Sequence, residues 1–122
     1  MTTVHAAAVL LFLLGLAHSV LGERYILMRL FRRDNLPRLF GGTAFTTRTL
    51  RFAWHITTVA WWGMAALLWQ AASGEPGRGT VLSVLGWTML LSGMLPLVMT
   101  RGRHLSWLVF FLVGGLALWA AG

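Results

Sequence analysis

The chain has 122 residues, of which 57% are hydrophobic and 11% charged, a balance too apolar for a water-soluble domain of this length. It contains no cysteine, which excludes disulfides, thiolate metal ligands and covalently attached c-type haem. All ten basic side chains are arginines, and the formal net charge is +7. Because these arginines lie beside hydrophobic segments, they indicate membrane topology and contact with anionic lipid headgroups rather than nucleic-acid binding.

Four apolar stretches approach the length of about 20 residues that a helix needs to cross a bilayer. They cover residues 4–22, 52–72, 81–99 and 105–121. The chain begins without the positive charge of a secretory signal, so we expect the first stretch to be a retained helix. The sequence therefore predicts an all-α fold, a four-helix transmembrane bundle formed by a single domain over residues 1–122.

The charges of the connections predict the orientation of this bundle. The connection at 23–51 carries seven arginines against two acidic residues, and the short connection at 100–104 adds two more arginines. The connection at 73–80 is neutral, with Glu75 and Arg78. By the positive-inside rule the basic connections face the cytoplasm, which places both termini in the periplasm of a bacterial inner membrane.

The long connection also has a pattern of its own. Between residues 24 and 33, arginines fall on one side of a helical projection and apolar residues on the other. The first helix is therefore expected to continue beyond the membrane or to bend into the interface. Pro37 follows a polar pair and should end this segment, and Thr46 and Thr47 are expected to cap the second helix.

Small residues at helical spacing predict where the helices touch, because membrane helices associate through close packing. Ala8, Gly15 and Gly22 repeat every seven residues on the first helix, and His18 lies on the same seam. His18 is therefore expected to face protein. Similar small-residue positions occur on the third and fourth helices, at Gly86, Gly93 and Gly114-Gly115.

Two histidines, His18 and His55, lie within apolar stretches at a similar distance from the arginine-rich connection. Ionisable residues inside membrane segments are functional candidates by default. On the second helix, Arg51 and Thr58 share a face with His55 through spacings of three and four. The predicted polar pocket near the cytoplasmic leaflet contains His18, His55, Glu23, Arg51 and Thr58, with His104 as a further candidate.

This pocket is compatible with three kinds of chemistry. A haem b could be held axially by His18 and His55, with Arg51 and Arg24 pairing its propionates. A divalent metal could take its ligands from His18, His55, His104 and Glu23. A proton relay could connect Glu23 to the interior through histidine.

The plainer interpretation is that both histidines form hydrogen bonds between helices. The protein would then be a structural or accessory subunit of a larger membrane complex or a homo-oligomer. An oligomeric transporter of small molecules or lipids is a weaker alternative. The sequence lacks the mid-membrane carboxylate of small multidrug antiporters, and it lacks the Glu-x-x-His pairs of di-iron bundles.

Two stretches of sequence resemble a family of small bacterial four-span inner-membrane proteins whose function is unknown. The first is Ala17-His18-Ser19-Val20-Leu21-Gly22-Glu23-Arg24-Tyr25 and the second is Arg51-Phe52-Ala53-Trp54-His55-Ile56-Thr57-Thr58. The resemblance covers about the first 70 residues. It implies a bacterial inner-membrane protein and no particular activity.

Overall fold

The computed structural model describes all of residues 1–122, and its regular elements are all helices, which confirms the predicted all-α class. A single isolated β-bridge pairs Leu39 with Gly42 in the long connection, and no strand forms. The elements are α1 (Thr3–Gly22), the π-helical turn η1 (Glu23–Leu27), α2 (Met28–Leu30), α3 (Ala44–Ala72), α4 (Arg78–Met99) and α5 (Ser106–Ala121).

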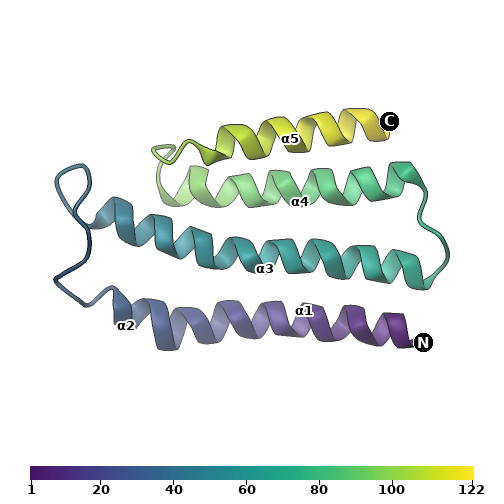
Figure 1. Ribbon diagram of the computed structural model, residues 1–122, viewed down its shortest axis with the longest axis horizontal. Coiled ribbons are helices and arrows are strands. Elements are labelled where there is room, and N and C mark those ends of the chain that lie inside the picture. Colours follow the sequence, from purple (N-terminus) through teal and green to yellow (C-terminus); the bar gives the residue numbers. More distant parts are fainter.

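The four long helices lie side by side in a row, in the order α1, α3, α4, α5 (Figure 1). Packing joins each helix to its neighbours in this row, so α1 and α5 form the two edges of an open bundle. Both chain termini lie at the same end (Figure 1). Because the helices form one layer, only 15 of the 122 residues are buried.

The start of α3 differs from the predicted one. We expected Thr46 and Thr47 to cap this helix, but α3 begins at Ala44, after the N-cap residue Thr43. The hydroxyl of Thr46 instead donates a hydrogen bond to the carbonyl of Pro37 at 2.7 Å. Thr46 therefore ties the long connection to the first turn of α3, a tertiary contact that local capping rules do not include.

We expected the first helix either to continue or to bend after residue 22. In the structure the helix continues. The π-helical turn η1 carries it into α2, in line with α1 (Figure 1). Leu27 is buried, whereas the arginines of the segment, Arg24 and Arg29, are exposed. The amphipathic pattern of the sequence therefore corresponds to a helical extension with one packed side.

The predicted small-residue seam on α1 is confirmed, since Ala8, Gly15 and Gly22 are the buried residues of this helix. A Cβ atom at Gly15 would lie 2.7 Å from the indole nitrogen of Trp62, and one at Gly22 would overlap the indole of Trp54. Such distances leave no room for a side chain. Glycine is what lets tryptophans of α3 lie directly against the backbone of α1.

The contact between α4 and α5 follows the same principle. A Cβ atom at Gly86 would lie 2.7 Å from the Leu118 side chain, and one at Gly114 would lie 2.7 Å from Leu90. Gly115 faces open space. Of the glycine pair in α5, therefore, only Gly114 forms the close approach.

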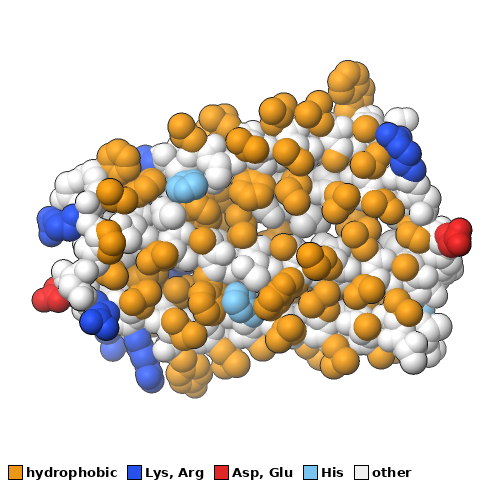
Figure 2. Space-filling view, in the orientation of Figure 1, with side chains coloured by type: hydrophobic (Ala, Val, Ile, Leu, Met, Phe, Trp, Pro, Cys, Tyr) orange, Lys and Arg blue, Asp and Glu red, His pale blue; other side chains and the backbone are white.

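Apolar and charged side chains occupy different parts of the surface (Figure 2). Hydrophobic side chains cover the middle of the helices, and arginines gather at the end that holds the long connection. Large side chains are exposed along every long helix, including Leu10, Trp87 and Trp119. Two helical segments, Thr3–Leu30 and Arg78–Met99, are long and apolar enough to cross a membrane, and the apolar α5 is shorter, at 16 residues.

Candidate functional site between α1 and α3

The centre of the candidate site is His55, whose two ring nitrogens both meet polar groups of the first helical segment. Its Nε2 lies 3.0 Å from a carboxylate oxygen of Glu23. Its Nδ1 lies 2.8 Å from the hydroxyl oxygen of Ser19. The imidazole therefore connects an acidic group and a hydroxyl, which both belong to the facing segment.

A guanidinium group holds the carboxylate of Glu23 from its other side. Nη2 of Arg51 lies 2.8 Å from one carboxylate oxygen, and Nε donates to the other at 3.2 Å. This fork matches the two oxygens of an ionised carboxylate. An ionised Glu23 has no proton to give, so Nε2 of His55 must be the donor in their hydrogen bond. In the neutral imidazole this leaves Nδ1, the nitrogen beside Ser19, as the basic one.

The hydroxyl of Ser19 lies between His55 and a second hydroxyl. It is 2.6 Å from Oγ1 of Thr58, which donates to the carbonyl of Gly15 at 3.2 Å. When the Ser19 hydroxyl donates to Nδ1 of His55, the single hydrogen of Thr58 is shared between the Ser19 oxygen and this carbonyl. Serine and threonine inside helices commonly bond back to the carbonyl four residues earlier. Thr88 does so in this chain, with Val84 at 2.7 Å, whereas Ser19 is directed across the interface.

The π-helical turn η1 begins at Glu23, the residue whose carboxylate contacts His55 and Arg51. Its wider winding is marked by the hydrogen bond from the Met28 amide to the Glu23 carbonyl, five residues back. Such a turn changes the angular positions of the residues that follow it, and π-turns in helices occur frequently at functional sites. Ser19 and Glu23, four residues apart, both face α3 at this point.

The site lies on the wall of an open cavity of about 530 Å³. Ser19, Glu23 and His55 line it together with Val20, Met28 and Arg24, and the surface that these residues expose to it is predominantly apolar. Arg24 forms no ion pair with a carboxylate, and its guanidinium carbon lies 5.7 Å from the ring centre of Tyr25. The residues around this cavity therefore carry a hydroxyl, an imidazole, a carboxylate paired with Arg51, an unpaired cation and two apolar side chains.

His18 belongs to a different arrangement. Its Nε2 donates to the carbonyl of Trp54 at 3.2 Å, and the indole nitrogen of Trp54 donates to the carbonyl of His18 at 2.9 Å. The two rings stack at 4.5 Å with their planes 1° apart. His18 lines a separate cavity with Trp54, so the structure does not bring it into the cavity of His55. Its contacts correspond to the interhelical hydrogen bonding of the plainer interpretation.

The expected haem site does not fit these contacts. Axial ligation by two histidines needs a free nitrogen lone pair on each ring, directed into a common slot. Both nitrogens of His55 are engaged, and one face of the His18 ring is covered by Trp54. Arg51, expected to pair a propionate, is held by Glu23.

The expected metal ligands are likewise not assembled. No group of three or more histidine, cysteine, aspartate or glutamate side chains is placed to hold a metal ion. His55 and Glu23 are paired, but His104 lies elsewhere, 2.8 Å from the Ser106 hydroxyl and edge-on to Phe52.

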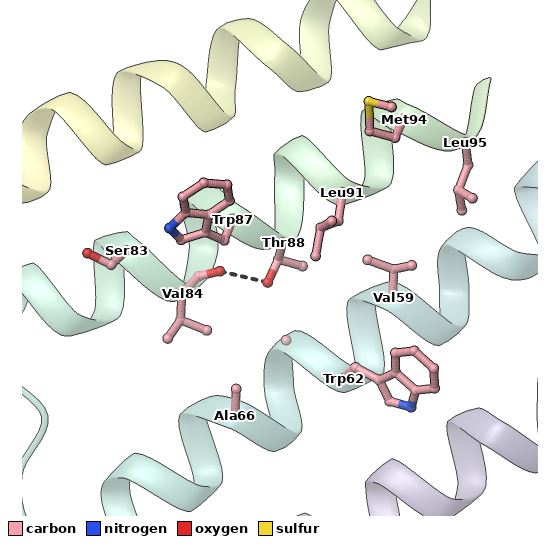
Figure 3. A pocket seen from close by; sticks show the side chains of 11 residues that line it. Val59, Trp62, Ala66, Ser83, Val84, Trp87, Thr88, Leu91, Met94 and Leu95 are labelled. Carbon is pink, nitrogen blue, oxygen red and sulfur yellow. Dashed lines mark hydrogen bonds between the residues drawn. The ribbon is translucent and has the colours of Figure 1, made fainter. Parts of the chain in front are cut away.

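A further cavity of about 580 Å³ opens between α3 and α4 and is predominantly apolar (Figure 3). Trp62 and Trp87 flank it, and the hydroxyl of Thr88 in its wall is already bonded to the Val84 carbonyl (Figure 3). It contains no titratable side chain. The chemistry of the chain is therefore concentrated at the α1–α3 interface.

Sequence reasoning placed Glu23, Arg51, His55 and Thr58 together, and the structure brings these four into one network. It did not assign a role to Ser19, which the structure places at the middle of that network. A signal was available in the sequence, because Ser19 and Glu23 are four residues apart and share a helix face.

Comparison of the chain with protein-family models, curated proteins and solved structures finds no match. The resemblance of its first 70 residues to small bacterial four-span proteins stays a prediction. The function must therefore be argued from the site itself.

Proposed function

We propose that the protein is a small bacterial inner-membrane protein that carries out acid–base chemistry on a polar group at the cytoplasmic membrane surface, with His55 as the proton acceptor. The observation that carries this proposal is the placement of His55 between Glu23 and Ser19. A carboxylate that fixes the tautomer of an imidazole, and so orients its free nitrogen toward a hydroxyl, is a recurring arrangement in proton transfer.

The membrane part of the proposal is supported by the distribution of side chains. Two helical segments satisfy the length and composition of membrane spans, and large apolar side chains surround the single layer of helices. A soluble monomer rarely exposes contiguous apolar surface on this scale. We propose that α1, α3, α4 and α5 all cross the bilayer, with the arginine-rich end in the cytoplasm and both termini in the periplasm.

The acid–base proposal is tested by the tautomer of His55. Protein labelled with ¹⁵N-histidine is reconstituted in lipid nanodiscs, and the ring shifts of His55 are assigned by their loss in His55→Gln. We expect neutral His55 to carry its proton on Nε2, and we expect Glu23→Gln to introduce the other tautomer. Glu75→Gln, at the opposite end of the molecule, is the matched control and should leave the spectrum unchanged. A proton on Nδ1 of neutral His55 in the wild-type protein would contradict the proposal.

A second candidate function is that of an accessory subunit in a larger membrane complex. It is favoured by the open row of helices, which leaves both flanks of the layer exposed. Membrane helices of this kind associate through packing of small and aromatic residues. Purification in a mild detergent tests it: a reproducible stoichiometric protein partner supports the subunit function, and a stable isolated protein opposes it.

A further inference from the structure

Ser19, His55 and Glu23 have the connectivity of a nucleophile, a general base and the acid that orients the base. The hydroxyl of Ser19 lies 2.8 Å from Nδ1, and the carboxylate of Glu23 lies 3.0 Å from Nε2 of the same ring. Both distances fall within the range in which a base takes a proton from a nucleophile and is itself oriented by a third group. We infer that Ser19 is a nucleophile activated by His55 and Glu23, and that the site cleaves a carboxylic ester of an anionic amphiphile. This inference rests on the proposed acid–base function of His55.

The direction of the Ser19 side chain favours a reactive hydroxyl. The hydroxyls of Thr88 and Thr100 bond back to carbonyls four residues earlier, whereas those of Ser19 and Thr58 cross between α1 and α3. The Ser19 hydroxyl crosses the interface to His55 and Thr58 and lines the open cavity. Ser19 is thus both paired with a base and part of the cavity wall.

The acid that orients His55 is held in place. Arg51 grips both oxygens of Glu23, so the carboxylate stays ionised and in place while His55 gains and loses a proton. This is the role of the third member in serine triads, which sets the tautomer and stabilises the imidazolium that forms. Here Nδ1 faces the nucleophile and Nε2 faces the acid.

The cavity wall indicates the class of substrate. Val20 and Met28 offer apolar contact to a chain, and Arg24 offers a cation that no carboxylate neutralises. The cavity lies at the arginine-rich end, where anionic lipid headgroups would gather. An ester with an acyl chain and a negative charge matches these features.

The reaction balances without a further reagent. The Ser19 oxygen bonds to the ester carbonyl carbon while its proton passes to Nδ1 of His55. The carbon–oxygen bond to the alcohol then breaks, and the departing alkoxide takes that proton. Water next attacks the acyl-serine and gives a proton to Nδ1, from which the Ser19 oxygen recovers it as the carboxylic acid leaves.

The test uses the full-length protein in vesicles of phosphatidylethanolamine and phosphatidylglycerol, treated with a long-chain alkyl fluorophosphonate and digested for mass spectrometry. We expect an adduct on Ser19 that forms at least about 100-fold faster than on Ser73, Ser83 or Ser106, the factor that a general base contributes. His55→Gln and Glu23→Gln should each slow labelling of Ser19 by at least about 10-fold, since the base is lost or misoriented. His104→Gln, outside the site, is the matched control and should label like the wild type.

A second measurement uses the wild-type protein alone and so does not depend on whether a variant folds. The wild-type protein should release a burst of p-nitrophenol from a long-chain p-nitrophenyl ester. The burst should equal one molecule of p-nitrophenol for each protein chain, because each chain has one Ser19. Labelling of Ser19 at the rate of Ser83, or no burst, would overturn the inference. If the labelling and burst tests fail but neutral His55 carries its proton on Nε2, the acid–base proposal stands without the reactive Ser19. A proton on Nδ1 would overturn both the acid–base proposal and the reactive Ser19.

Discussion

At the scale of single residues, the two histidines singled out by the sequence have separate roles. His55 joins Glu23 and Ser19, whereas His18 forms reciprocal hydrogen bonds with Trp54 and stacks on its indole. The similar distances of the two histidines from the arginine-rich connection did not distinguish these roles. The distinction depends on which way each ring turns, and that is decided by the neighbouring helix.

The indole of Trp54 should contribute measurably to the stability of the α1–α3 contact. Trp54→Phe keeps an aromatic ring beside His18 and removes the hydrogen bond from the indole nitrogen to the His18 carbonyl. We expect a loss of about 1 kcal/mol in the free energy of unfolding, as for a typical interhelical hydrogen bond. Circular dichroism during unfolding in mixed detergent micelles measures this loss. Trp119→Phe, at a side chain that is 81% exposed, is the control, and equal losses in the two variants would contradict the assignment.

At the scale of elements, glycine positions determine how closely the helices approach. Gly22 lies against Trp54, and no Cβ atom fits there. Gly115 lies on α5 with open space around it. The same substitution at these two positions therefore separates the effect of packing from the effect of helix propensity.

We predict that Gly22→Ala lowers the free energy of unfolding by about 1–3 kcal/mol, because the added methyl forces the indole of Trp54 away from α1. Gly115→Ala should leave it unchanged or raise it by up to about 1 kcal/mol, because alanine is the better helix former. Unfolding in mixed micelles measures both variants. The packing account fails if Gly22→Ala is as stable as the wild type.

Much of the helical architecture follows from the sequence, because helix length, small-residue spacing and charge are local patterns. The seam through Ala8, Gly15 and Gly22 was predicted, and so was the grouping of Arg51 and His55 with Glu23. The π-helical turn and the place of Ser19 could not be predicted in this way. The place of Ser19 depends on how α1 is rotated against α3, where Trp54 and Trp62 lie against glycines of α1. The arrangement of the helices in an open row depends on which helices pack against each other. The four apolar stretches of the sequence do not specify these pairs.

At the scale of the whole molecule, charge and apolar surface are arranged along the helix axes. Both termini and the Glu75 connection lie at the end opposite the arginine-rich connection. This polarity is the basis of the proposed orientation, in which the Ser19–His55–Glu23 network lies toward the cytoplasmic side.

The absence of native cysteine allows this orientation to be tested directly. We predict that Glu75→Cys is labelled in intact cells by a maleimide that does not cross the inner membrane. Arg38→Cys, in the long connection, should be labelled only after the cells are permeabilised, because positive connections stay in the cytoplasm. Labelling of both sites from the same side, or the reverse pattern, would contradict four crossings in the proposed orientation.

The proposed acid–base site requires Glu23 of η1 and His55 of α3 to be paired when the protein is in a bilayer. This pairing is tested most directly by a dipolar-recoupling solid-state NMR measurement between the ¹³C-labelled carboxyl of Glu23 and the ¹⁵N-labelled Nε2 of His55 in lipid vesicles. The account predicts strong dephasing, as required by the 3.0 Å between Nε2 and the carboxylate oxygen. No measurable coupling between these two nuclei would show that the pair does not form, and the proposed acid–base site would be lost with it.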